Sequence, residues 1–263
     1  ALHLLPRTRL GPRFSCAPRQ AGGRPARPVL RPGKCDRINP MRMKIVLASN
    51  SPRRRQLLGW LGIEFEARPA DIDESPRPGE LPQPYVLRLA EGKARAAGAC
   101  RPQGCLVLAA DTIVADGAAL LGKPAGADEA RAMLSTLRGR VHQVHTALAL
   151  LDPAGSELLT ELCSTDVPMR AYSDAEIDVY IASGDPLDKA GAYAIQNAAF
   201  HPVEKFGGCY ASVMGLPMCH LLRGLRRMNA LNGDLPDVKQ VCRANLNYDC
   251  PISEAVLRGE AVG

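Results

Sequence analysis

The sequence contains few aromatic residues and no long apolar run. Phe, Trp and Tyr make up 4% of its 263 residues, and there is a single Trp. Stacking platforms for single-stranded nucleic acid are difficult to build from so few rings. No stretch approaches the roughly 18 to 20 consecutive apolar residues that a membrane-spanning helix needs. The composition therefore argues against an integral membrane protein and against a base-stacking nucleic-acid binder, and it predicts an aliphatic core.

Three motifs that mark common hydrolase and nucleotide sites are also missing. The sequence has no GxSxG elbow, no GxxxxGK[ST] phosphate loop, and no GxGxxG after its first apolar run. These absences argue against Ser-triad hydrolases and P-loop NTPases.

The nine cysteines contain no CxxC pair and no repeated metal-ligand spacing. A structural zinc site normally uses two such pairs. An odd number of cysteines without a secretory signal favours reduced thiols in a cytoplasmic compartment. We therefore expect a cytoplasmic protein in which cysteine has no chemical role.

The excess of positive charge is confined to the first 40 residues. They carry nine basic residues against the single acid Asp36, whereas the remainder carries 24 basic and 26 acidic residues. A weakly acidic body gives little support to general DNA binding. An RNA-associated protein that acts through the basic segment remains a rival hypothesis.

The basic segment also holds seven of the 22 prolines and has no helical or strand periodicity. We predict a disordered Arg/Pro-rich extension over residues 1–42, upstream of a natural start at Met41 or Met43. A transit peptide is the alternative, although Pro and Gly are too dense there for an amphipathic helix. One domain is expected over residues 43–228, followed by a tail, 229–263, of uncertain order.

The first regular elements predict an anion site. Residues 44–48 form a short apolar run typical of a buried strand. Ser51 and Pro52 then mark the start of a helix that Gly62 ends. The helix N-terminus, the hydroxyl groups and three consecutive arginines at 53–55 gather around one point, where they favour binding of an anion.

Further along the chain, helical and strand patterns alternate, which predicts a mixed α/β fold. Helices are expected at 84–99, 128–139, 173–184 and 216–228. Strands are expected at 105–114, 142–151, 157–170 and 210–213. The strands at 142–151 and 157–170 should form a hairpin, and the helix at 173–184 should begin with a capping box of Ser173 and Glu176.

Asp111 is the strongest candidate for chemistry from residue type alone. It interrupts an apolar strand, together with Thr112, and both side chains are expected at one end of that strand. A carboxylate in such a run is costly unless it is paired or binds a cation. Lys123 and Lys189 lie beside Gly or Pro, where a ligand can approach the backbone.

Six segments resemble, in order, the motifs of the Maf family of nucleotide pyrophosphatases. They are LASNSPRRRQLL, AADTIV, LGKP, HQVHTALAL, SGDPLDKAGAYAIQ and GLP, and they span about residues 43–225. The resemblance implies a Maf/ITPase-like α/β fold, in which helices flank a mixed twisted sheet and a cleft lies between two lobes. It also implies a homodimer and hydrolysis of a nucleoside triphosphate to the monophosphate and pyrophosphate, with a divalent metal, Mg²⁺ or Mn²⁺, as cofactor.

The resemblance also assigns roles to individual residues. Asp111 corresponds to the catalytic aspartate, expected to act as a base and as a metal ligand. Glu74 or Asp73 would assist the metal, and Asp71 in the same DIDE run is a further possibility. The phosphate-binding residues would be Ser51, Arg53, Lys93, Lys123 and Lys189.

At three positions the sequence resembles the branch of the family that acts on dTTP and UTP. They are Arg53, Thr112 and Gln196. We therefore expect a house-cleaning hydrolase of dTTP and UTP, with modified pyrimidine nucleotides as further candidate substrates, related to cell division arrest. A 7-methyl-GTP pyrophosphatase, or a nucleotide-binding septation regulator without turnover, is the alternative. The chain departs from the family pattern after Gln196, which affects the wall of the base pocket.

Overall fold

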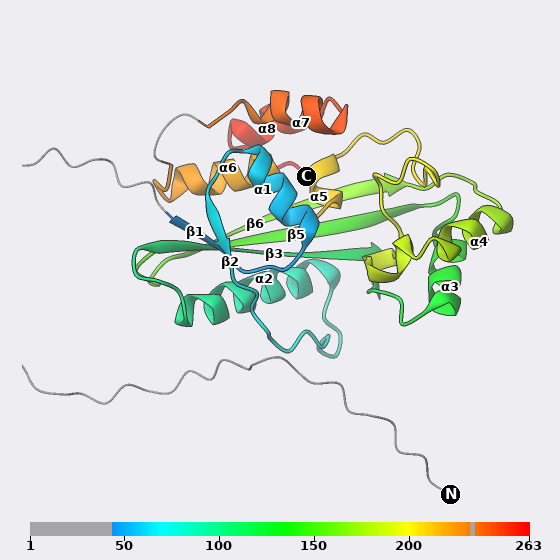
Figure 1. Cartoon of the computed structure of the whole chain (residues 1–263), viewed down its shortest axis with the longest axis horizontal. Helices are drawn as coiled ribbons and strands as arrows, with labels where there is room; N and C mark the ends of the chain where they lie inside the picture. The colour runs from blue at the N-terminus through cyan, green and yellow to red at the C-terminus, as the bar shows by residue number, and fades with distance from the viewer. Residues whose placement is uncertain (1–43, 232–234) are drawn as a thin grey trace, which may run out of the picture. The chain divides into compact units, whose positions relative to one another are not determined.

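The computed structural model describes residues 44–231 and 235–263, in which a mixed six-stranded sheet has helices on both faces (Figure 1). This arrangement confirms the predicted mixed α/β class. The extension expected at residues 1–42 lies outside the described residues. Among the described residues, no helix has both the length and the apolar character needed to cross a bilayer.

The sheet combines parallel and antiparallel pairs. Its order is β2 (Phe65–Ala67), β1 (Lys44–Leu47), β3 (Cys105–Asp116), β5 (Val141–Leu151) and β6 (Leu158–Pro168). β1 runs parallel to β2 and β3, whereas β3, β5 and β6 are antiparallel to their neighbours. A short strand, β4 (Ala119–Leu121), also pairs with β3. The expected hairpin of β5 and β6 is confirmed.

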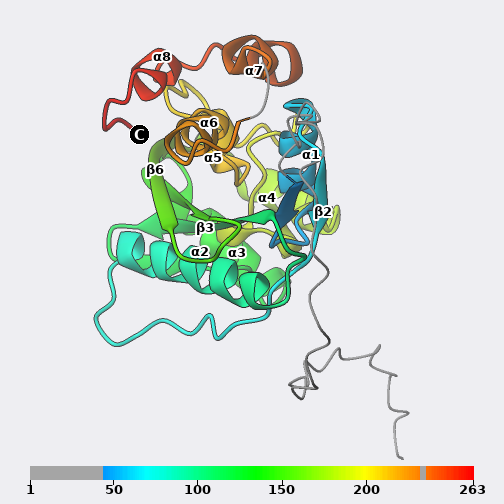
Figure 2. The ribbon, with the colours of Figure 1, turned by 90° about the vertical axis from the view of Figure 1, so that its left-hand side faces the viewer.

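Helices cover both faces of the sheet because its central strand, β3, has apolar side chains on both faces. Leu106 and Leu108 of β3 pack beneath α1 (Pro52–Trp60) and α6 (Met218–Arg227). Val107 and Ala109 point the other way, into a core formed with α2 (Pro82–Ala99). Figure 2 shows α2 on one side of the sheet and α6 on the other. β3 is therefore fixed from both faces.

A third core lies at the end of the sheet beside α3 (Ala127–Leu137) and α4 (Asp174–Ala182). The predicted capping box is present, because Ser173 and Glu176 each accept a hydrogen bond from the other's backbone N–H. Two 3₁₀ turns, η1 (Asp185–Asp188) and η2 (Ala190–Ala192), return the chain from α4 to β3.

The predicted strand at 210–213 is wrong, because these residues form a short helix, α5 (Tyr210–Val213). Their backbone hydrogen bonds are local, including Met214 N–H to the carbonyl of Tyr210 at 3.1 Å. Four apolar or small residues are too few to distinguish a strand from a helical turn by periodicity.

Residues 235–263 contain two helices that the sequence pattern does not reveal, α7 (Val238–Leu246) and α8 (Ser253–Leu257). Both lie outside α6, on the side away from the sheet (Figures 1 and 2). Val238, Cys242, Cys250 and Val256 are buried in the same core as α1 and α6.

A gap in strand pairing along β3 creates the space for a site. β1 ends opposite Leu108, and pairing with β4 starts only at Val114, opposite Leu121 on the same edge, while β5 covers the other edge. Within the described residues, 109–113 therefore have no neighbouring strand on the first edge. Asp111 and Thr112 lie in this gap, in the middle of β3 rather than at its end as predicted, because β3 continues beyond them against β5.

Candidate active site

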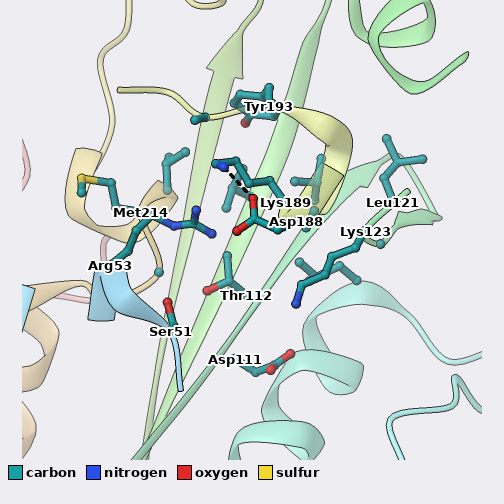
Figure 3. A pocket seen from close by; sticks show the side chains of 18 of the residues that line it. Ser51, Arg53, Asp111, Thr112, Leu121, Lys123, Asp188, Lys189, Tyr193 and Met214 are labelled. Atoms are coloured by element: carbon teal, nitrogen blue, oxygen red, sulfur yellow. Dashed lines mark hydrogen bonds and ion pairs between the residues drawn. The ribbon is translucent and has the colours of Figure 1, made fainter. Parts of the chain in front are cut away.

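A cavity of about 690 Å³ opens at the gap in the sheet. Asp71 and Asp73 are absent from its lining, which includes the other residues that the sequence and the resemblance assigned to the site: Ser51, Arg53, Glu74, Lys93, Asp111, Thr112, Lys123, Lys189 and Gln196. Figure 3 shows that Ser51, Asp111 and Lys189, for example, come from separate parts of the chain. Five cations and three carboxylates line the cavity, which suits a polyanionic ligand.

The centre of the site is an ion-pair cluster of three side chains from three elements. Nζ of Lys93, on α2, lies 2.5 Å from Oδ1 of Asp111 and 2.7 Å from Oε1 of Glu74. Lys93 and Asp111 are 9% and 8% exposed, whereas Glu74 is exposed. Because a buried ion pair is costly to break, Lys93 holds the Asp111 carboxylate in one orientation.

Glu74 is the acid of the DIDE run that reaches this cluster. The backbone carbonyl of Glu74 accepts a hydrogen bond from Tyr85 Oη at 2.8 Å, which ties its loop to α2. Asp73 instead accepts a hydrogen bond from the backbone N–H of Ser75 at 2.9 Å, and this bond lowers the pKa of Asp73. Asp71 is exposed and does not line the cavity.

The second arginine of the SPRRR turn is the one that connects the turn to the rest of the site. Arg54 donates to the carbonyl of Gly215 at 2.9 Å, to Oγ of Ser49 at 3.3 Å and to Oγ1 of Thr112 at 3.1 Å. Burial lowers the pKa of Arg54, although the charge of Asp111 opposes this shift. Arg54 thus joins α1, β3 and the segment after α5.

Thr146 is a residue of this network that the sequence analysis missed. It lies opposite Thr112 across β3 and β5, with 3.0 Å between the two hydroxyl oxygens, and it donates to the carbonyl of Ser212 at 2.8 Å. A polar residue inside the apolar HTALALL run was the available signal. Gly215 closes the network at φ 107°, where an added Cβ would lie 3.3 Å from Arg54 and Thr112.

The other two arginines of the turn have different surroundings. Arg53 lines the cavity and extends toward Asp188 and Lys189 (Figure 3). Arg55 is exposed and donates to Oδ1 of Asn50 at 2.9 Å, outside the cavity. Successive helical residues point about 100° apart, which separates the three guanidinium groups.

Two of the lysines that line the cavity differ in whether their ammonium group is paired with a carboxylate. Lys189 is buried, and its Nζ lies 2.6 Å from Oδ1 of Asp188 and 2.5 Å from the carbonyl oxygen of Asp185. Lys123 is exposed and enters from the side opposite Arg53 (Figure 3). Within the described residues, Lys123 and Arg53 form no ion pair, so both are available to an incoming anion.

The wall of the cavity that carries Gln196 also contains Tyr193, which the sequence analysis did not single out. Tyr193 is buried and hydrogen-bonds through Oη to Nε2 of His142 at 2.8 Å, which fixes this wall to β5. Burial lowers the pKa of His142 to about 4, so the imidazole is neutral at pH 7. Gln196, three residues beyond Tyr193, is exposed at the cavity rim.

The donor set is compatible with a divalent cation that is completed by a substrate. Asp111 and Glu74 bring two carboxylates from separate elements to one point. Mg²⁺ in nucleotide sites is commonly held by one or two carboxylates together with substrate phosphates and water. Residues 44–231 and 235–263 contain no group of three His, Cys, Asp or Glu arranged to hold a metal ion. The protein would therefore supply only part of the coordination shell.

Comparison with known proteins agrees with the geometry of the site. The chain is 49% identical over 187 residues to a protein of Citrifermentans bemidjiense named dTTP/UTP pyrophosphatase, covering 71% of this chain and 96% of that protein. It is 50% identical over 190 residues to a protein of the same name from Anaeromyxobacter dehalogenans, covering 71% and 95%. A family model described as Maf-like protein matches residues 44–228. The chain therefore belongs to the Maf family.

Proposed function

We propose that this protein hydrolyses dTTP and UTP to the nucleoside monophosphate and pyrophosphate. The observation that carries the proposal is the cavity in which Asp111 lies among Arg53, Lys93, Lys123 and Lys189. A nucleoside triphosphate carries roughly four negative charges at neutral pH, and its hydrolysis needs those charges balanced and a water placed in line with the leaving group. The names of the relatives support the choice of pyrimidine nucleotides.

The side chains divide this work according to their surroundings. Arg53 and Lys123 bind phosphate oxygens first, since neither has a carboxylate partner among the described residues. Lys189 contributes from the opposite wall when a phosphate competes with Asp188 for its ammonium group. The helix N-terminus after Ser51 adds backbone N–H groups to the same region.

Asp111 accepts the proton of the attacking water. Its carboxylate is buried and held by Lys93, so it presents one oxygen in a fixed direction while bulk water is kept away. The water attacks the α-phosphorus, the bond from this phosphorus to the bridging oxygen breaks, and pyrophosphate leaves with the electron pair. Lys93 stays next to the carboxylate as it becomes neutral.

A divalent cation is the proposed cofactor, with Asp111 and Glu74 as its protein ligands. When bound, it would place positive charge beside the phosphate oxygens. It would thereby partly neutralise the negative charge that develops on the leaving pyrophosphate. Since Glu74 is on an exposed loop, its carboxylate can turn away from Lys93 to bind the cation. Loss of turnover after chelation, with recovery on adding Mg²⁺ or Mn²⁺, is the expected result.

The base would be read at the Gln196 side of the cavity. Uracil and thymine present a carbonyl, an N–H and a second carbonyl along one edge, so a matching site needs a donor, an acceptor and a donor. A Gln amide supplies one of each, and Thr112 or a backbone N–H completes the set. Such edge-specific hydrogen bonding gives roughly tenfold or greater discrimination between bases.

Hydrolysis in H₂¹⁸O of a panel containing dTTP, UTP, GTP and 7-methyl-GTP tests the reaction and the base preference together. We expect ¹⁸O in the nucleoside monophosphate, unlabelled pyrophosphate, and kcat/KM at least about tenfold higher for dTTP and UTP. Nucleoside diphosphate and orthophosphate as first products would overturn the reaction. Preference for 7-methyl-GTP would overturn only the base assignment, and tight binding without turnover would favour a regulator.

The resemblance also leads us to propose a cytoplasmic homodimer that acts without a nucleic acid or a membrane. Light scattering after gel filtration should give twice the mass of the chain. Retention on a heparin or RNA column that persists after removal of residues 1–40 would contradict the absence of a nucleic-acid partner.

A further inference from the structure

Five cysteines meet where the C-terminal segment, residues 235–263, contacts the core. This segment lies beyond the residues 44–228 that the family model matches. Cys242 and Cys250 belong to the segment, whereas Cys163 lies on β6 and Cys209 immediately precedes α5. Tyr248 anchors the segment by donating a hydrogen bond to the carbonyl of Gly208 at 2.9 Å.

Cys209 and Cys250 form the contact between the two parts. Their side chains are close enough for each to shift the pKa of the other, and Sγ of Cys250 also lies 3.9 Å from the carbonyl oxygen of Gly208, the residue before Cys209. Both residues line a narrow cavity beneath α7, together with Cys219 and Cys242. Cys163 also influences the pKa of Cys209, but it is 0% exposed and does not line this cavity. Cys209 and Cys250 therefore face this cavity, and Cys163 does not.

The surroundings make the thiols of this cavity chemically unequal. The hydrogen bond with Cys209 lowers the pKa of Cys250 to about 7. Hydrogen bonds to Cys163 and Cys250, together with burial, raise the pKa of Cys209. Burial raises the pKa of both Cys219 and Cys242 to about 12. Since the thiolate is the nucleophilic form, Cys250 is the reactive sulfur and Cys209 is the neighbouring thiol.

We propose that Cys209 and Cys250 form a reversible oxidation site, at which a peroxide joins the C-terminal segment to the core through a disulfide. The thiolate sulfur of Cys250 attacks one peroxide oxygen, the O–O bond breaks, and hydroxide leaves, so that Cys250 becomes a sulfenic acid. The sulfur of Cys209 then attacks the Cys250 sulfur, the S–O bond breaks, and water leaves with the thiol proton. The two thiols lose two electrons, which reduce the peroxide, and a dithiol reverses the reaction.

The position of Cys209 gives the oxidation site a connection to the active site. Its backbone carbonyl accepts the hydrogen bond from Val213 N–H that closes α5. The same short segment continues to Gly215, whose carbonyl holds Arg54. In the oxidised protein, residues 235–263 are covalently fastened to this segment. The proposal changes the expectation that cysteine has no chemical role.

Peptide mapping of the full chain tests the site directly. The reduced protein is treated with hydrogen peroxide at pH 7, digested without reductant and analysed by mass spectrometry. We expect one linked peptide pair that contains Cys209 and Cys250 and separates on addition of dithiothreitol. Cys250→Ser and Cys209→Ser should abolish the pair, whereas Cys242→Ser, in the same cavity, should retain it. A Cys163–Cys209 link, or no link, would overturn the proposal.

Two further measurements separate the chemistry from a folding defect. In Cys209→Ser, dimedone should label Cys250 after peroxide treatment, because the sulfenic acid lacks its thiol partner. Peroxide should raise the Tm of the wild type by about 5 °C or more, since the disulfide restricts the unfolded chain, and it should leave the Tm of Cys250→Ser unchanged. The wild-type peptide map needs no variant, so it decides the outcome even where a variant folds poorly.

Discussion

Nζ of Lys93 lies 2.5 Å from Oδ1 of Asp111, and the two side chains reach this contact from the two layers α2 and β3. Glu74 shares the same ammonium group from a loop without regular structure. The proposed general base is therefore positioned by a partner that is itself buried, while the third member of the cluster is exposed.

Asp111→Asn should lower kcat for dTTP about 10²- to 10⁴-fold, because the amide cannot accept the proton of the attacking water. The fold should persist, since Lys93 keeps Glu74 as a partner. Asp116→Asn is the matched control, because Asp116 lies on the same strand but contacts Arg140 outside the cavity. Steady-state kinetics and circular dichroism check both variants, and near-normal turnover of Asp111→Asn would assign the base to Glu74 or another acid.

Lysine substitutions at the three arginines should have three different outcomes. Arg53→Lys should lower kcat/KM about tenfold or more at unchanged Tm, because Lys cannot bind a phosphate through two parallel N–H groups. Arg54→Lys should also lower stability by about 2 kcal/mol, since two of its three hydrogen bonds are lost. Arg55→Lys should match the wild type. Kinetics and thermal unfolding distinguish these results, and equal effects at all three positions would mean that only diffuse charge matters.

Gln196→Glu should narrow the difference in kcat/KM between dTTP and GTP, because a carboxylate places an acceptor where a base carbonyl needs a donor. The expected loss for dTTP is about tenfold. Gln56→Glu, on the exposed face of α1 and outside the cavity, controls for the added charge. Unchanged base preference in Gln196→Glu would remove Gln196 from the recognition of the base.

The free energy of unfolding should fall as the pH drops from about 6.5 to about 4. Burial lowers the pKa of His142 and of His220 from 6.5 to about 4, so the unfolded chain binds more protons than the folded chain within this range. Each histidine contributes roughly 3 kcal/mol, which is fully present above pH 6.5 and lost on acidification. Urea unfolding at several pH values checks this expectation.

His142→Gln should show a shallower pH dependence, because one of the buried imidazoles with a lowered pKa is removed. His201→Gln, at an exposed position, should follow the wild type. A slope that is identical in His142→Gln and the wild type would assign the acid sensitivity to other groups.

The helices and strands with clear sequence signals were predictable. The arrangement of the site could not be predicted from these signals alone. Ser51 with Pro52, and Ser173 with Glu176, mark helix starts through local capping that does not depend on tertiary structure. The order of the motifs indicated which residues share a cavity. It did not show that Arg54 is the arginine that contacts Gly215 and Thr112. The three arginines are consecutive and of the same type, and the packing of α1 against the core decides which of them faces the site.

Two other features were hidden because they depend on contacts between distant segments. The pairing of Glu74 with Lys93 joins an irregular loop to a helix, and no periodic pattern records such a contact. The helices of residues 235–263 are short and are buried through a few positions such as Val238 and Val256, so their apolar pattern is weak. Tertiary packing, rather than local propensity, stabilises elements of this kind.

The long strand β3 has a consequence for how the protein opens in solution. β3 is paired with β5 from Val107 to Ala115 and helices pack on both of its faces, so the amide hydrogens around Asp111 that bond to β5 should exchange with deuterium only in rare openings of the core. Residues 71–75, which carry Glu74, lack regular structure and are largely exposed, so their amides should exchange early. Deuterium uptake would then divide the site into a slow half and a fast half, and a bound nucleotide should slow exchange mainly in the fast half.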